Sequence, residues 1–129
     1  MTTPDIPAAV LEFISKRIDT VPQLESLLIM SADENRVWSV DDIAARTYVV
    51  AAAAAAVLNE LHRRQLIALG EDGQHYQYCP ASEEERQTVA QTAIAYRRHL
   101  IPLATYIHSK ASSSVKEFAR AFALKKDLE

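Results

Sequence analysis

Apolar residues recur at helical spacing through the first half of the chain, and short polar stretches interrupt the pattern. Prolines and capping residues stand just ahead of the apolar repeats, where they favour the first turn of a helix. Ser39 and Asp42 form one such start, a capping-box pattern. The spacing predicts four helices, over about residues 6–18, 20–30, 40–46 and 50–65. The fourth helix should turn four apolar side chains to the core: Ala54, Val57, Leu58 and Leu61.

The pattern changes from helical spacing to two β-prone runs between residues 66 and 78. The runs flank a polar turn in which Asp72 and Gly73 favour a tight connection between antiparallel strands. A further, very short strand is predicted at residues 36–38. The expected fold class is therefore mainly α with a small β-hairpin.

A long amphipathic helix is predicted after the hairpin, opened by a second capping-box pattern at Ser82 and Glu85. Apolar residues then recur in alternating steps of four and three, which is the spacing of a heptad seam. The seam consists of Val89, Ala93, Tyr96, Leu100, Leu103 and Ile107. Pro102 lies inside it and should kink or break the helix nearby. A last amphipathic helix is expected after the serines at 112–114.

This apolar seam is longer than one small domain needs, and an exposed apolar stripe favours association. We therefore expect residues 81–129 to form a helical dimerisation region beside a first domain at residues 1–80, and the protein to be a homodimer. Residues of the first and last helices should join the seam in the interface: Leu11, Ile14, Phe118 and Phe122. The last helix can instead fold back over part of the seam.

Charge is unevenly divided along the chain. Residues 1–85 hold six Lys and Arg against fourteen Asp and Glu, whereas residues 86–129 hold eight against three, for a net charge of −3. The two parts can attract each other in the fold, or the basic part can meet an anionic partner. The start of the chain has no signal-peptide pattern, and its longest apolar run, residues 48–58, is too short to span a membrane. We expect a cytoplasmic protein that does not bind membranes.

No pattern typical of catalysis or metal binding stands out. His75 and Cys79 share one face of a predicted strand, but two potential ligands do not make a zinc site. The glutamates at 83–85 are explained by helix capping, and no phosphate-binding loop or nucleophile motif is present. We therefore expect no enzyme activity, no cofactor and no metal. Four aromatic side chains are predicted to pack in the core: Trp38, Tyr48, Tyr76 and Tyr78.

The central part of the chain resembles the helix-turn-helix core of bacterial winged-helix regulators of the multiple-antibiotic-resistance-regulator type. The matching residues are Ile43-Ala44 for a Leu-Ala pair, Val57 and Leu61 for two apolar anchors, and Leu66-Ile67 for the step into the wing. The short strand before these residues and the hairpin after them come in the same order, so the resemblance covers about residues 20–80. It implies a winged helix-turn-helix fold and a DNA-binding transcription regulator.

The resemblance also implies that the helix over residues 50–65 enters the major groove. The candidate contact residues are Arg46, Ala52, Ala55, Ala56, Asn59, Arg63 and Arg64. The chain departs from the family pattern at Val50, where a Ser or Thr cap is usual, and at Gln65, where Gly is usual. The alanine run from Ala51 to Ala56 offers only methyl groups, whereas base readout normally uses hydrogen-bonding side chains.

Two functions therefore stay open. The first is a small homodimeric transcription regulator that binds duplex DNA. The second is a winged helix used for protein interaction, in which the face from Ala51 to Ala56 packs against another protein. Glu71 and Asp72 at the tip of the wing, and the acidic balance of residues 1–85, favour the second function, since attraction to phosphates supplies most nonspecific DNA affinity. The DNA-binding character of the family it resembles favours the first.

Overall fold

The computed structural model describes residues 6–110, and the order of its elements matches the order that the sequence pattern predicts. The elements are α1 (Ala8–Arg17), α2 (Val21–Ser31), α3 (Val40–Thr47), α4 (Ala51–Arg63), β1 (Ile67–Leu69), β2 (Tyr76–Tyr78) and α5 (Glu83–Arg98). Residues 100–110 are helical again. The predicted last helix, with Phe118 and Phe122, lies outside the described residues.

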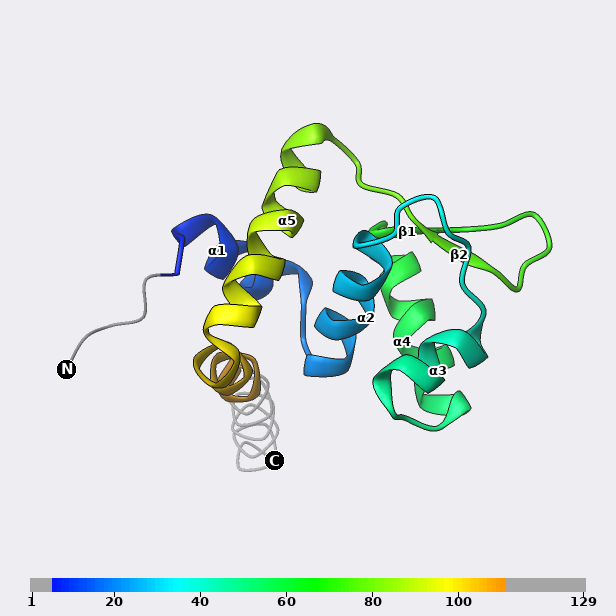
Figure 1. Cartoon of the computed structure of the whole chain (residues 1–129), viewed down its shortest axis with the longest axis horizontal. Helices are drawn as coiled ribbons and strands as arrows, with labels where there is room; N and C mark the ends of the chain where they lie inside the picture. Colours follow the sequence, from blue (N-terminus) through cyan, green and yellow to red (C-terminus); the bar gives the residue numbers. More distant parts are fainter. Residues whose placement is uncertain (1–5, 111–129) are drawn as a thin grey trace, which may run out of the picture.

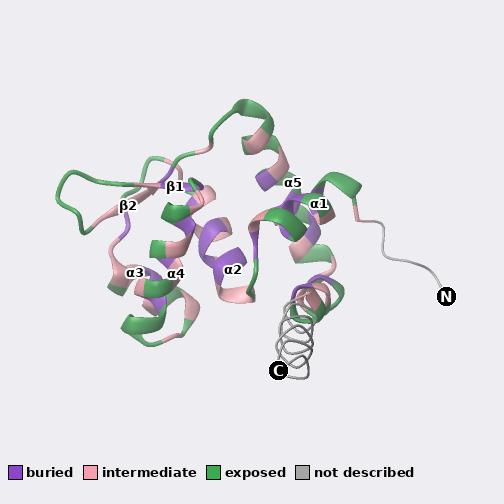
Figure 2. Cartoon of the chain, turned by 180° about the vertical axis from the view of Figure 1, so that it is seen from behind, coloured by how far each residue is buried: buried purple, intermediate pink, exposed green. Residues whose placement is uncertain are grey.

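Helix α2 lies at the centre of the fold. Figure 1 shows α3, α4 and the hairpin on one side of α2, and α1, α5 and residues 100–110 on the other. Leu24, Leu27 and Met30 are fully buried in α2, which appears as a purple centre in Figure 2. Because α2 packs against α3, α4, β2 and α5, it joins the helix-turn-helix part to the C-terminal helices.

A sharp turn separates α3 from α4, as the resemblance implied. Tyr48 closes α3 in the left-handed conformation with φ of 58°. The Val49 N–H donates to the Ala44 carbonyl at 3.2 Å, and α4 begins after Val50. The prediction of two helices, rather than one continuous helix from residue 43 to 65, is therefore confirmed.

The start of α3 is fixed by a complete capping box. The Asp42 N–H donates to Ser39 Oγ at 3.1 Å, and the Ser39 N–H donates to Asp42 Oδ2 at 3.0 Å. Both bonds satisfy backbone groups that a helix start otherwise leaves open.

Replacing Ser39 by Ala should therefore lower the free energy of unfolding by about 1 kcal/mol. Urea unfolding followed by circular dichroism measures this loss. Ser15→Ala is the matched control, because Ser15 is exposed in the interior of α1. Equal stabilities of the Ser39→Ala and Ser15→Ala variants would contradict the capping role.

The wing is an antiparallel hairpin of β1 and β2, and Trp38 pairs with the outer side of β2. Ile67 pairs with Tyr78 and Leu69 with Tyr76, and Gly73 takes a φ of 70° in the connecting turn. Trp38 bridges to Tyr76 by two backbone hydrogen bonds of 2.7 and 2.8 Å. The short strand predicted at residues 36–38 is thus a single bridge.

The end of α4 is closed without the glycine that the family pattern has. Gln65 adopts a φ of 64°, its N–H donates to the His62 carbonyl at 2.9 Å, and the Leu66 N–H donates to the Leu61 carbonyl at 3.0 Å. These two bonds form a Schellman motif, and the buried side chains of Leu61 and Leu66 supply its hydrophobic contact. Gln65 therefore replaces Gly without changing the path into the wing.

The long C-terminal helix breaks at His99, three residues before Pro102. Proline has no N–H to donate to the carbonyl of residue 98, and its ring crowds that carbonyl. His99 accordingly leaves the helical region, with φ of −133° and ψ of 48°. The predicted interruption is confirmed, and it divides the proposed seam into two segments.

Candidate nucleic-acid interface

One side of α4 faces away from the fold and forms a line of exposed residues. The exposed line comprises Ala52, Ala56, Asn59 and Arg63, and Ala55 beside it is half-buried. The opposite side carries the fully buried Ala54, Leu58 and Leu61. The first two turns of the exposed line present methyl groups alone, and hydrogen-bonding side chains begin at Asn59.

The turn before α4 adds two exposed apolar side chains to this face. Tyr48 is 94% exposed and Val50 is 73% exposed. The expectation that Tyr48 packs in the core is wrong, whereas Trp38 and Tyr78 are buried as predicted and Tyr76 is half-buried. Tyr48 is the residue that closes α3 in the left-handed conformation, so it lies beyond the helix whose inner side packs on the core. The sequence could have indicated this exposure, because Tyr48 follows the last residue of α3 and lies in the turn.

The two adjacent arginines at the end of α4 have different surroundings. The side chain of Arg63 is 69% exposed and pairs with Glu60 at 2.5 Å. Arg64 is only 17% exposed, and its guanidinium binds Asp19, Glu60 and the Arg17 carbonyl. Hydrogen bonds from Arg63 and Arg64 lower the pKa of Glu60 to about 2. Arg64 therefore ties the end of α4 to the connection between α1 and α2, while Arg63 stays accessible.

Arg46 lies in the last turn of α3 and is exposed. Its guanidinium carbon is 5.6 Å from the centre of the buried Trp38 ring, and that of Arg36 is 3.8 Å away. Both distances fit cation–π contacts, which hold the two charges near the surface beside α3. Arg46 is thus a second accessible cation near the turn.

The tip of the wing carries negative charge. Asp72 Oδ1 accepts from the Gln74 and His75 N–H groups at 2.9 and 3.1 Å, and Oδ2 lies 2.5 Å from His75 Nδ1. The backbone bond from Gln74 and the contact with His75 lower the pKa of Asp72. With Glu71 also exposed, the tip is unsuited to contact phosphates.

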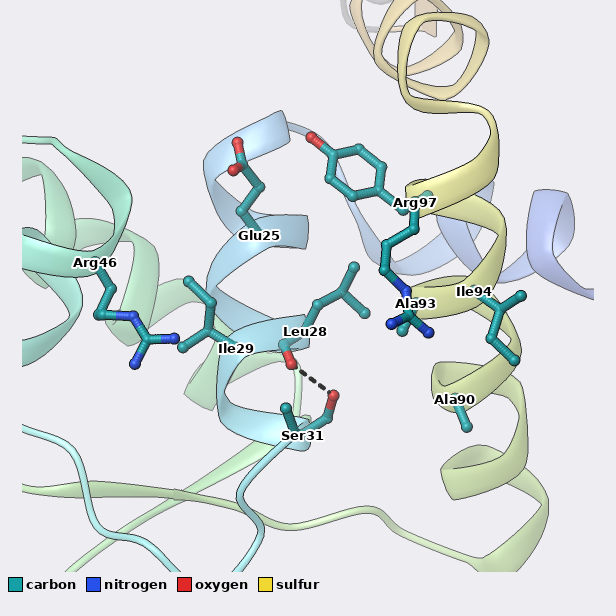
Figure 3. Close-up of a pocket in the computed structure, with 11 residues that line it drawn as sticks. Glu25, Leu28, Ile29, Ser31, Arg46, Ala90, Ala93, Ile94 and Arg97 are labelled. Carbon is teal, nitrogen blue, oxygen red and sulfur yellow. Dashed lines mark hydrogen bonds between the residues drawn. The ribbon is translucent and has the colours of Figure 1, made fainter.

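A surface groove of about 570 Å³ runs between α2 and α5. Figure 3 shows its apolar lining, which includes Leu28, Ile29 and Ile94, with Arg46 and Arg97 approaching from opposite sides. The sequence pattern did not indicate this groove, because it depends on how two helices distant in sequence are placed.

The residues expected at a dimer interface fall into two groups. Ile14, Val89, Leu103 and Ile107 pack inside the chain's own core, with at most 1% exposure. Leu11, Ala93 and Tyr96 are half-buried, and Leu100 is 50% exposed. The break at His99 divides the six seam positions into Val89, Ala93 and Tyr96 before it and Leu100, Leu103 and Ile107 after it. Ile94 and Ile101, which were not among the expected residues, are exposed beside this region.

Within residues 6–110, no group of three or more His, Cys, Asp or Glu side chains is arranged to hold a metal ion. His75 contacts Asp72, and Cys79 is exposed. In the same range, no helix is long and apolar enough to cross a membrane.

No protein-family model matches the chain, and a search of characterised proteins finds no match either. The fold is similar to that of the YusO protein from Bacillus subtilis, with a TM-score of 0.50 over 90% of this chain and 82% of that chain at 16% identity. It is also similar to the heme sensor protein PefR from Streptococcus agalactiae in complex with heme, with a TM-score of 0.51 over 89% and 79% at 14% identity. These similarities confirm the winged-helix fold that the central part of the sequence predicts.

Proposed function

We propose that this chain is a winged-helix transcription regulator that binds duplex DNA through α4 and acts as a homodimer through its C-terminal helical region. The exposed face of α4 carries the proposal, because it follows a true helix-turn-helix turn and projects away from the rest of the fold. In helix-turn-helix proteins, that helix occupies the major groove. The fold of this chain is that of winged-helix regulators, which supports this general kind of function.

The proposed contact combines apolar and backbone groups with few charges. Methyl groups of Ala52 and Ala56 suit contact with thymine methyl groups in the major groove. Val50 provides no side-chain cap, and the first turn of α4 has no acidic residue, so its N–H groups are available to a phosphate. Arg63 and Arg46 supply the positive charge that the acidic wing lacks.

The proposed dimer brings two copies of α4 to one duplex. Its interface would include the exposed side chains Ile94, Leu100 and Ile101, which flank the break between α5 and residues 100–110. A two-fold axis there would present the recognition helices to symmetric half-sites, separated by roughly one turn of DNA.

Replacing Arg63 by Ala should weaken binding to all duplex sequences alike. It should also reduce the slope of log affinity against log salt concentration by about one unit for each phosphate contact that is lost. Fluorescence anisotropy with labelled duplexes at several salt concentrations measures both effects. Arg86→Ala is the matched control, because Arg86 is also exposed and ion-paired but lies at the start of α5. Equal salt slopes for the Arg63→Ala variant and the wild type would show that Arg63 does not contact phosphate.

A further inference from the structure

Charged side chains from four parts of the chain meet at the connection between α1 and α2. We refer to this group as the linker cluster, which consists of Arg17, Asp19, Glu60, Arg64, Glu85 and Lys110. Asp19 lies on that connection itself, and the other members come from the ends of α1 and α4, the start of α5 and the last described turn of the C-terminal helix. The cluster therefore joins the helix-turn-helix part to the C-terminal part directly, beside the contacts made by α2.

Arg17 and Arg64 hold the ends of α1 and α4 together by a reciprocal pair of bonds. Arg17 Nη2 donates to the Arg64 carbonyl at 2.7 Å, and Arg64 Nη1 donates to the Arg17 carbonyl at 2.8 Å. Arg17 Nη1 also donates to Glu85 Oε1 at 3.0 Å, and the side chain of Glu85 is only 11% exposed. These charge-assisted bonds satisfy carbonyl groups at the ends of both helices.

Asp19 accepts hydrogen bonds from the end of α4 and from the C-terminal helix. Arg64 Nη2 binds one of its carboxylate oxygens, and Lys110 Nζ donates to the other at 3.2 Å. Lys110 Nζ also donates to the carbonyls of Ile14 and Ile18, at 3.2 and 2.5 Å. Partial burial opposes ionisation of Asp19, but the bonds from Arg64 and Lys110 outweigh it and lower the pKa of Asp19. The carboxylate is thus charged at neutral pH.

We infer that the linker cluster couples the position of the C-terminal helix, residues 100–110, to the end of α4. Both are attached to one carboxylate on a short connection, and Arg64 is the residue that caps α4. A shift of Lys110 changes its hydrogen bond to the Asp19 carboxylate, and that carboxylate also binds the Arg64 side chain. If α4 contacts DNA as proposed above, a change in packing of the C-terminal helices reaches the DNA-contacting helix by this route.

Amide hydrogen exchange of the DNA-free protein, followed by mass spectrometry, tests this coupling. Lys110→Met removes the amine and keeps an apolar stem of similar length. We expect exchange in peptides covering residues 60–66 to become about threefold faster or more, with exchange in α3 unchanged, because local opening depends on local contacts. Lys16→Met is the matched control, since Lys16 is 69% exposed and pairs only with Glu12 among the contacts found in residues 6–110; it should leave both regions unchanged.

Unchanged exchange at residues 60–66, or a uniform increase over the whole chain, would overturn the inference. Asp19→Asn provides a second variant and should produce the same local pattern, and Lys110→Met alone decides the matter if Asp19→Asn does not fold. Because no DNA is present, the result is independent of the proposed function. Failure of the wild-type protein to bind DNA would overturn that function and leave the coupling standing.

Discussion

Replacing Leu103 by Asp is expected to unfold the protein or to lower its stability by more than about 3 kcal/mol, because an unpaired carboxylate would enter a fully buried position. A loss of this size is a large part of the stability of a typical domain. Thermal unfolding followed by circular dichroism measures it.

Leu103→Met is the control for that experiment, because it nearly conserves volume and should cost less than about 1.5 kcal/mol. Similar unfolding midpoints for Leu103→Asp and the wild type would show that residues 100–110 do not pack against the core as described. The contrast matters because Leu103 and Leu100 occupy neighbouring positions of the predicted seam but differ completely in exposure.

Replacing Leu100 and Ile101 together by Asp is expected to dissociate the homodimer and to leave the monomer folded. These side chains are 50% and 74% exposed in the single chain, so their replacement removes little from its core. In a two-fold interface, the same changes would bring four carboxylates close together without partners, which costs several kcal/mol. Light scattering should give twice the chain mass of 14.4 kDa for the wild type and one chain mass for the variant.

Thr105→Asp serves as the control, because Thr105 is exposed on the same helical segment. A monomer mass for the wild type at tens of micromolar would contradict the proposed dimer. A dimer mass for the doubly substituted variant would show that the interface lies elsewhere on the chain.

Features that depend on neighbouring residues were predictable from the sequence. Ser39 and Asp42 form the capping box that their spacing indicated, and the turn with Asp72 and Gly73 connects the two strands. The burial of Leu58 and Leu61 followed from their spacing. In each case the determining atoms lie within a few residues of one another, so local chemistry was sufficient.

Features that depend on distant residues were not predictable in the same way. Arg64 looked equivalent to Arg63 in the sequence, but Asp19 and Arg17 bind it because α1 and α4 end at the same place. The seam appeared continuous, but the helix breaks at His99, where φ of −133° and ψ of 48° leave the helical region. Neither effect follows from hydrophobic spacing, since both depend on how separate helices pack.

Titration of the wild-type protein with mixed-sequence duplex DNA at low and moderate salt tests the central claim most directly. If Arg46 and Arg63 of both subunits contact phosphates, four contacts give a slope of roughly −3.6, and affinity should fall about a hundredfold between about 50 and 200 mM salt. Fluorescence anisotropy measures this dependence without knowledge of the operator. Absence of binding at both salt concentrations would contradict a DNA-binding function and would favour a winged helix that contacts another protein through the alanine face of α4.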